Sequence, residues 1–307
     1  MIILGFSLPF DLVCQLATAV HGVWGDHGLT RLCLVSRDFR DAGVPILYRA
    51  LLLDTDALML HFANFMAGSA KSLKHTRALS PWRDLDEAAL DRAARIIDSC
   101  PNVSNLQTRL DVLLRRCRRR PKHLKTLFTW IDDASWTMLL DNPTLVDWHH
   151  LRRLHIEWPE LRLAEHGTVS RDNLERVFSP ANLPRLTHAS IRWSFDYDFA
   201  TQFRGSVRRF ARLSDIILQL PTLERMLWRV PAKYAHRALA VPEANDPRVH
   251  LDLQDVKFAR ATNAGPATSN KGLWWDDSMG KKSMWTVGVP ALDFIEHFSD
   301  SPTSDSS

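Results

Sequence analysis

The segment Leu151-Arg-Arg-Leu154-His-Ile156 has the apolar spacing of a short strand and the turn that leads into it. Alternate side chains of a strand point to the same face, so Leu154 and Ile156 share one face. Similar units start at Val103, Leu124, Leu186 and Leu223. Four of the five units have a proline two or three residues upstream, namely Pro101, Pro121, Pro184 and Pro221. The pattern predicts a series of strands, each with a buried apolar side.

The spacing of these units favours a repeat architecture. Successive starts are 21, 27, 35 and 37 residues apart, whereas regular leucine-rich repeats are about 20–29 residues long, so the later units would carry insertions. A single strand–helix unit cannot bury its apolar face, so neighbouring units stack and share one core. We expect an α/β fold: an irregular leucine-rich-repeat-like solenoid over residues 54–298, with parallel strands and right-handed helical crossovers. The alternative is an unrelated α/β domain in which the spacing is coincidental.

Other segments extend this expectation. Helices are predicted after Asp56 and over residues 84–99, and the leucine run 51–53 is predicted to be a strand. Residues 159–173 and 262–283 are rich in polar or small side chains and are predicted to be surface loops. Residues 299–307 contain no apolar side chain and are predicted to be disordered.

The first fifty residues have helical periodicity. Leu8, Leu12, Leu16 and Val20 recur every four residues, which aligns them along one side of a helix. Pro9 suits the first turn of that helix because its missing N–H would have no partner there. This segment is therefore predicted to be the first helix of an N-terminal helical module.

A second helix is predicted after the glycine-rich segment 22–28. Its apolar stripe consists of Leu29, Leu32, Val35 and Phe39. Gly43 is predicted to be its C-cap, since glycine readily adopts the left-handed conformation that ends many helices. A third, short helical turn is predicted to begin at Pro45. Three short helices make a marginal core, so some apolar surface is expected to remain for a partner or for the next domain.

Three stretches, in order along the chain, resemble the F-box family. They are Leu8-Pro9-x-Asp11-Leu12-x-x-x-Leu16, Leu32-x-x-Val35-Ser36-Arg37-x-Phe39-Arg40 and Pro45-x-Leu47-Tyr48-Arg49. The match covers about residues 6–50. Phe39 stands where many members of that family have tryptophan, and the segment between the first two helices is unusually rich in glycine.

The F-box resemblance implies that residues 1–53 dock onto the linker subunit of an SCF-type ubiquitin ligase and so join its cullin scaffold. The implied docking residues are Leu8, Pro9, Leu12, Leu16, Leu32, Val35, Phe39, Leu47 and Tyr48. The alternative is a generic three-helix cap in which the same residues form the core.

The rest of the chain resembles fungal F-box proteins with irregular leucine-rich repeats. The stretch Asp246-Pro247-Arg248-Val249-His250-Leu251 resembles their closing Asp-Pro-Arg strand, and residues 285–298 resemble their tryptophan-containing closing helix. The resemblance implies a substrate-recognition adaptor, which holds an unknown protein substrate while other subunits carry out the ubiquitin transfer. The alternatives are an interaction scaffold that docks onto no ligase, and a nucleic-acid binder that uses a basic patch.

Composition restricts the function classes. The 307 residues are 45% hydrophobic and 24% charged with a net charge of +4, which is ordinary for a globular protein and too modest to favour nucleic-acid binding. The four cysteines lie far apart, which is typical of reduced thiols inside the cell. The sequence shows no signal-peptide pattern and no apolar run of about 18–20 residues. We therefore expect a cytoplasmic or nuclear location, or both, with no membrane contact.

Sequence motifs give no indication of catalysis. The chain contains no HExxH, GxSxG, GxGxxG or Walker A motif, and its thirteen histidines lack the spacing of metal ligands. We expect a protein that is not an enzyme and uses no metal or cofactor.

Two groups of residues are candidate binding sites in the second domain. The basic stretch consists of Arg115, Arg116, Arg118, Arg119, Arg120 and Lys122. It could serve in nuclear import or phosphate contact, but a solvated helix end with cations near the negative pole of its dipole is the favoured interpretation. Tryptophan is enriched at interaction hot spots, and the candidates for a substrate-binding face are Trp158, Trp193, Trp228, Trp274 and Trp275.

Overall fold

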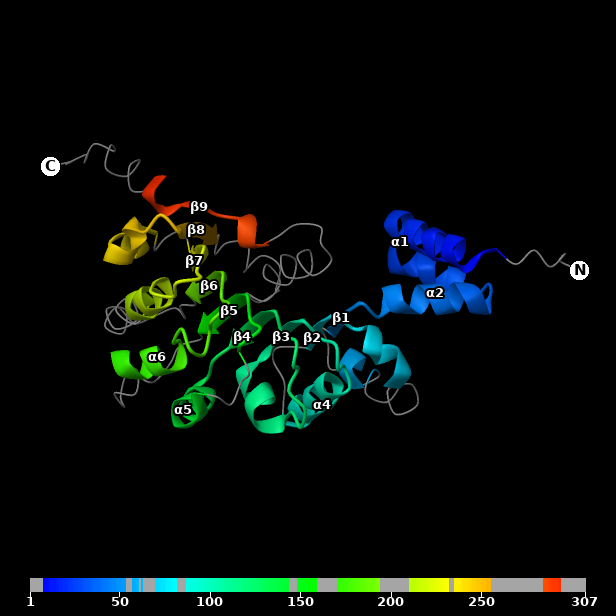
Figure 1. The fold of residues 1–307 in the computed structure, drawn as a ribbon, viewed down its shortest axis with the longest axis horizontal. Helices are drawn as coiled ribbons and strands as arrows, with labels where there is room; N and C mark the ends of the chain where they lie inside the picture. The colour runs from blue at the N-terminus through cyan, green and yellow to red at the C-terminus, as the bar shows by residue number, and fades with distance from the viewer. Residues whose placement is uncertain are drawn as a thin grey trace, which may run out of the picture.

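The computed structural model describes residues 8–53, 57–60, 62, 70–81, 87–143, 148–158, 170–193, 210–231, 235–254 and 284–293. These residues form a mixed α/β fold with a nine-stranded sheet, shown in Figure 1. The strands are β1 (Ala50–Leu53), β2 (Ala78–Pro81), β3 (Asn105–Arg109), β4 (Thr126–Trp130), β5 (Arg153–Trp158), β6 (His188–Trp193), β7 (Arg225–Pro231), β8 (Val249–Gln254) and β9 (Val289–Pro290).

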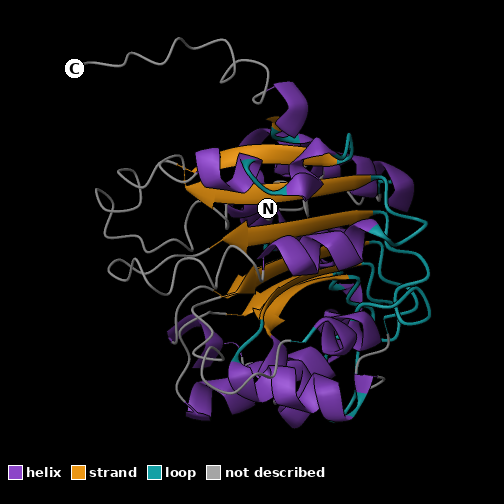
Figure 2. Ribbon diagram, turned by 90° about the vertical axis from the view of Figure 1, so that its left-hand side faces the viewer, coloured by secondary structure: helices purple, strands orange, loops and turns teal. Residues whose placement is uncertain are grey.

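Strand order in the sheet follows the order of the chain from β1 to β9. Neighbouring strands from β1 to β8 are parallel, and β9 runs antiparallel to β8. Figure 2 shows these strands lying side by side in one sheet. The strands predicted from the recurring apolar pattern are therefore confirmed, as are the leucine run that forms β1 and the closing strand β8.

Helices cover one face of the sheet, as Figure 1 shows for α4 (Glu87–Asp98), α5 (Asp133–Asp141) and α6 (Arg171–Val177). Residues 210–218 are also helical. Shorter elements are η1 (Ala70–His75), the π-helix η2 (Val112–Arg116), α8 (Ala235–Leu239), η6 (Pro242–Asn245) and η7 (Met284–Thr286). The helix predicted over residues 84–99 is confirmed as α4 for its described part.

The loop predicted over residues 159–173 is wrong at its end, because α6 begins at Arg171. The Ser170 hydroxyl accepts a hydrogen bond of 3.2 Å from the Asn173 backbone N–H, which caps this helix. The remainder of that predicted loop, most of the predicted helix after Asp56, the segment 262–283 and the tail 299–307 lie outside the described residues.

The main core lies between the sheet and its helices. Leu79, Leu106, Leu127 and Leu154 are register partners on four adjacent strands, and each is at most 1% exposed. The leucines of the approach turns are buried in the same cluster, namely Leu124, Leu151, Leu186 and Leu223. The apolar residues of the recurring sequence units therefore form one continuous core.

A repeated backbone pattern joins the turns that precede the strands. The N–H groups of Arg152 and Arg153 both donate to the Lys125 carbonyl, at 2.8 and 3.0 Å. One strand further, Thr187 and His188 donate to the Arg152 carbonyl in the same way. This pattern stacks the turn residues of successive units at one edge of the sheet.

The N-terminal module consists of α1 (Phe10–Cys33) and α2 (Arg37–Leu47) and lies at the β1 end of the sheet (Figure 1). Helix α1 continues past Gly22 and kinks at Gly25, whose φ of 63° favours glycine. The Ser36 hydroxyl accepts from the Phe39 N–H and caps α2.

Gly43 does not end a helix, as the sequence pattern predicted, but lies inside α2. A Cβ atom at this position would collide with the Cys33 Sγ and lie 3.2 Å from the Leu29 Cδ1. Glycine therefore allows α1 and α2 to pack closely. The predicted separate turn at Pro45 is also wrong, because Pro45 lies within α2.

Candidate protein-docking site

An apolar row lies exposed along the first half of α1. Leu12 and Leu16 are 41% and 39% exposed, and Leu8, just before the helix, is 42% exposed. Val13 and Ala17, one position further along the chain in each case, are buried in the small core of the module. Successive residues of a helix point about 100° apart, so Leu12 and Leu16 lie beside the side of α1 that carries Val13 and Ala17. The apolar part of the α1 surface is therefore wider than the part that packs into the module core.

A second apolar group lies at the turn between α1 and α2. Leu34 and Val35 are 83% and 70% exposed. Val23 and Trp24, just before the kink, and Phe10 at the start of α1 are exposed as well. We refer to the exposed apolar residues of the module, Leu8, Phe10, Leu12, Leu16, Val23, Trp24, Leu34 and Val35, as its exposed apolar surface. So many large apolar side chains exposed on a small module are typical of a protein that binds a partner.

The structure places only part of the predicted docking set on this surface. Leu8, Pro9, Leu12, Leu16 and Val35 are exposed. In contrast, Leu32, Phe39 and Leu47 are half-buried against the module core, and Tyr48 packs against the main core. These four are therefore placed to hold the module together and to join it to β1. Phe10, Val23, Trp24 and Leu34 were missed, because helical periodicity alone does not show which side of α1 the second helix covers.

On the face of the sheet away from the helices, several polar and charged side chains of the described strands are buried. Glu157 and Arg192, on β5 and β6, are buried and form an ion pair of 3.0 Å. On β5 the imidazole of His155 shares a 2.9 Å hydrogen bond with the Ser190 hydroxyl, and both side chains are buried. Arg229 forms a 2.8 Å ion pair with Asp252 further along the sheet.

Trp285, from η7, packs on this second face. Its ring lies 5.9 Å from that of Phe128 and 6.0 Å from that of His188, and the Arg153 guanidinium lies 6.0 Å from its centre. The Arg225 guanidinium donates to the Val287 carbonyl at 2.8 Å. Residues 285–287 therefore cover part of this face.

Of the predicted substrate-face tryptophans, the structure describes the side chain of Trp228. Trp228 is fully buried on the helix side, with its ring 4.9 Å from Phe210, so its assignment to a surface is wrong. An apolar side chain at this strand position serves the core. Trp158 and Trp193 are register partners at the ends of β5 and β6. Trp274 and Trp275 lie outside the described residues.

The basic stretch is tied to α4. Arg116 binds the carboxylates of Glu87 and Asp91, while the backbone N–H groups of Arg118 and Arg119 donate to the Asp98 carboxylate at 3.0 and 2.8 Å. The side chains of Arg115, Arg118, Arg119, Arg120 and Lys122 are exposed. Acidic groups of α4 thus offset part of this charge, which agrees with a solvated helix end.

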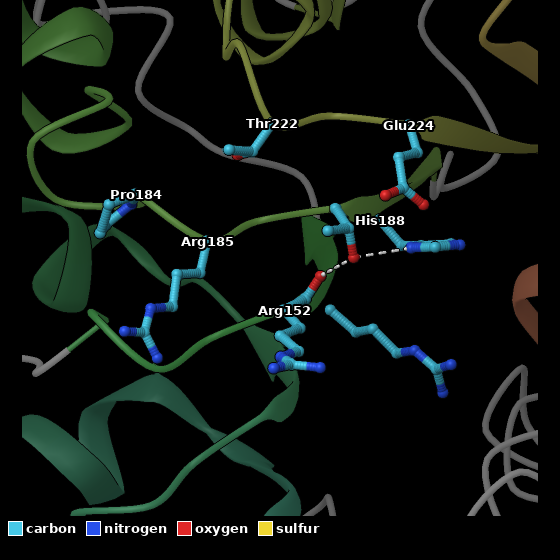
Figure 3. Close-up of a pocket in the computed structure, with 8 residues that line it drawn as sticks. Arg152, Pro184, Arg185, His188, Thr222 and Glu224 are labelled. Atoms are coloured by element: carbon cyan, nitrogen blue, oxygen red, sulfur yellow. Dashed lines mark hydrogen bonds between the residues drawn. The ribbon is translucent and has the colours of Figure 1, made fainter.

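A cavity of about 460 Å³ opens at the edge of the sheet where β5, β6 and β7 begin (Figure 3). Its lining includes Arg152, Arg153, Arg185, Thr187, His188 and Glu224. We call it the edge cavity. Sequence patterns did not predict it, because its residues come from three turns. The available clue was that Arg152, Thr187 and Glu224 occupy the same place between the apolar residues of three successive units.

Two further properties concern the described residues alone. None of their helices combines the length and the apolar character that crossing a membrane requires. Within the same residues, no three histidine, cysteine, aspartate or glutamate side chains are grouped as metal ligands.

Comparison with known proteins gives little further information. No family model matches the chain, and no curated protein matches it. Among solved structures, a protein from Bacteroides fragilis solved by a structural genomics consortium matches with 14% identity and a TM-score of 0.39, over 85% of this chain and 71% of that chain. A likeness of this size supports no argument about fold family or function.

Proposed function

We propose that this chain is a substrate-recognition adaptor of an SCF-type ubiquitin ligase, with the module of α1 and α2 docking onto the linker subunit. The observation that carries the proposal is the exposed row of Leu8, Leu12 and Leu16 together with Val35. These are positions at which the sequence resembles an F-box. A generic cap would bury these side chains, whereas the structure leaves them at the surface.

The second domain, in this proposal, is a degenerate leucine-rich-repeat solenoid. The strand order and the parallel pairing from β1 to β8 support this assignment, as do the helices on one face. The stacked turns before the strands give the repeat a regular edge even though the intervals between units vary. Inserted residues in the later units would then provide individual binding features.

The adaptor would contribute proximity rather than chemistry. It would hold a protein substrate near the ligase subunits that transfer ubiquitin, which raises the effective concentration of the reacting groups. Since much of the second sheet face is buried in the described residues, the substrate would bind at the strand edges and turns. The module and the repeat domain would thus divide the work between ligase docking and substrate binding.

Affinity capture of the tagged chain from eukaryotic cells, followed by mass spectrometry, tests this function. The wild-type chain should bring down the linker subunit and the cullin. The Leu12→Asp/Val35→Asp double variant should lose both, because it places charges on the proposed contact surface. Leu60→Asp alters an apolar residue that is 48% exposed outside the module and should retain both. Capture of neither subunit by the folded wild-type chain would exclude the adaptor function.

A further inference from the structure

Cations collect along the edge of the sheet at which the parallel strands begin. The exposed arginine and lysine side chains of the turns before β1 to β6 are Arg49, Lys74, Arg77, Lys122, Lys125, Arg152 and Arg185. We call these seven residues the basic strip. The turn segments 73–77, 101–105, 121–126, 148–153 and 183–188 contain no aspartate and no glutamate. The net charge of the chain is only +4, but its positive charge is concentrated on this edge.

Backbone hydrogen bonds between the turns fix the spacing of the strip. One carbonyl of each turn accepts hydrogen bonds from two successive N–H groups of the next turn. The equivalent positions on β1 to β6 are Arg49, Arg77, Ser104, Lys125, Arg152 and Thr187. Adjacent strands lie about 4.8 Å apart, so the four steps from Arg49 to Arg152 extend over about 19 Å. The strip ends at the edge cavity, where Glu224 takes the equivalent position before β7 (Figure 3).

The basic stretch joins the strip near its middle. Arg118, Arg119 and Arg120 are exposed and directly precede the turn that carries Lys122. The Asp98 carboxylate accepts hydrogen bonds from the backbone N–H groups of Arg118 and Arg119 and so holds this part of the backbone against α4. Because Lys122 belongs to both groups, the strip and the basic stretch form one continuous basic surface.

The phosphate backbone of a nucleic acid suits this surface. Attraction to that backbone comes mainly from the release of condensed counterions, so it depends on the density of cations and needs no fixed side-chain geometry. A double strand carries one negative charge per about 1.7 Å, whereas an extended run of acidic residues carries at most one per about 3.3 Å. A duplex therefore gains more from a strip of this length than an acidic protein segment would.

The surface also fits a double strand better than a single strand. Proteins that bind single strands stack the bases on aromatic side chains. The exposed side chains of the basic strip and the basic stretch include no phenylalanine, tyrosine or tryptophan. We propose that the basic strip and the basic stretch together bind double-stranded nucleic acid through its phosphate backbone. This binding is separate from linker docking, because the basic surface and the exposed apolar surface of the module share no residue.

Fluorescence anisotropy with the full chain tests the proposal. The probes are labelled DNA and RNA duplexes of about 24 base pairs, one of the separated strands, and a polyglutamate peptide of about 24 residues. At about 0.1 M salt, at least one duplex should bind with a Kd of about 10 μM or tighter and about fivefold or more tightly than the single strand and the peptide. Binding of neither duplex, or a single strand or peptide within fivefold of the better duplex, would overturn the proposal.

A variant of the strip locates the binding. Arg77→Ser/Lys125→Ser/Arg152→Ser removes three exposed cations and should weaken the duplex about tenfold or more. The slope of log Kd against log salt concentration should become less steep by about 2–3, since each lost phosphate contact contributes about 0.9. Unchanged affinity and slope in the folded variant would overturn the site.

A second variant tests the contribution of the basic stretch. Arg118→Ser/Arg119→Ser/Arg120→Ser keeps the backbone contacts with Asp98 and should also weaken the duplex about tenfold. This variant tests the same surface if the strip variant does not fold. Wild-type affinity in it would remove the basic stretch from the proposed surface.

A matched control separates the surface from the overall charge. Arg37→Ser/Arg171→Ser/Arg237→Ser removes the same charge from exposed positions on α2, α6 and α8. Its affinity for the duplex should remain within about threefold of that of the wild type. A loss as large as that of the strip variant would show that the duplex responds to net charge alone and would contradict the assignment to this edge.

Discussion

The Arg192 guanidinium donates a 3.0 Å hydrogen bond to the Glu157 carboxylate across the boundary between β6 and β5. Their side chains are only 7% and 2% exposed. Two charges held so far from water depend on one another, because an isolated buried ion is strongly disfavoured. This pair lies on the face of the sheet that the alternation of apolar and polar residues would predict to be exposed to solvent.

Replacing Arg192 with methionine should leave the Glu157 carboxylate buried without this cation. We expect the free energy of unfolding to fall by about 3–5 kcal/mol, measured by urea denaturation at neutral pH. The double variant Arg192→Met/Glu157→Met removes both charges and should recover much of that loss. A single variant as stable as the wild type would contradict the structure of this face.

Gly43 and Gly22 should respond in opposite directions to alanine. A methyl group at Gly43 collides with Cys33 of α1, so Gly43→Ala should lower the free energy of unfolding by about 1–3 kcal/mol. Gly22 is helical and has no atom within 4 Å of its would-be Cβ, so Gly22→Ala should raise it by about 0.5–1 kcal/mol. Thermal denaturation of the two variants measures this difference. A Gly43→Ala variant as stable as the wild type or more stable would show that α1 and α2 do not pack closely at Gly43.

Burial raises the pKa of the Cys100 thiol from 9.0 to about 12. Above pH 9 the unfolded chain loses this proton while the folded chain keeps it, so ionisation favours unfolding. The contribution of Cys100 to stability is therefore complete below pH 9 and declines between pH 9 and about 12. Urea denaturation at pH 8 and pH 10.5 should show a smaller decline in Cys100→Ala than in the wild type. An equal decline in both would contradict the burial of this thiol.

Strand positions were predictable from sequence because the determinant is local. Leu154 and Ile156 fall on one face of any strand formed there, and the approach-turn leucine Leu151 completes the unit. Burial of His155 and Glu157, which alternate with these apolar residues, was not predictable, since such alternation is typical of a strand with one solvated face. Trp285, which packs against Phe128 and His188 on that face, lies about 100–160 residues further along the chain, and no local pattern predicts such a contact.

The docking surface was predictable in part for a similar reason. Helical periodicity placed Leu12 and Leu16 on one side of α1, and both are exposed. Helical periodicity also placed Val35 and Phe39 on the same side of one predicted helix. In the structure Ser36 is the N-cap of α2, so Val35 lies before that helix and Phe39 within it. Val35 is consequently exposed in the turn, whereas Phe39 contacts the module core. A loss of binding in Phe39→Asp could result from unfolding of the module as well as from loss of docking. Val35→Asp changes an exposed side chain and is therefore the better test.

Calorimetric titration of the purified linker subunit into the purified chain tests the central proposal most directly. The wild type should bind one linker with a Kd of about 1 μM or tighter, and Leu12→Asp/Val35→Asp should bind at least about a hundredfold more weakly with its circular dichroism spectrum unchanged. Leu60→Asp should match the wild type. Absence of binding by the folded wild type, or equal binding by the double variant, would contradict docking through the exposed row of α1 and the turn that follows it.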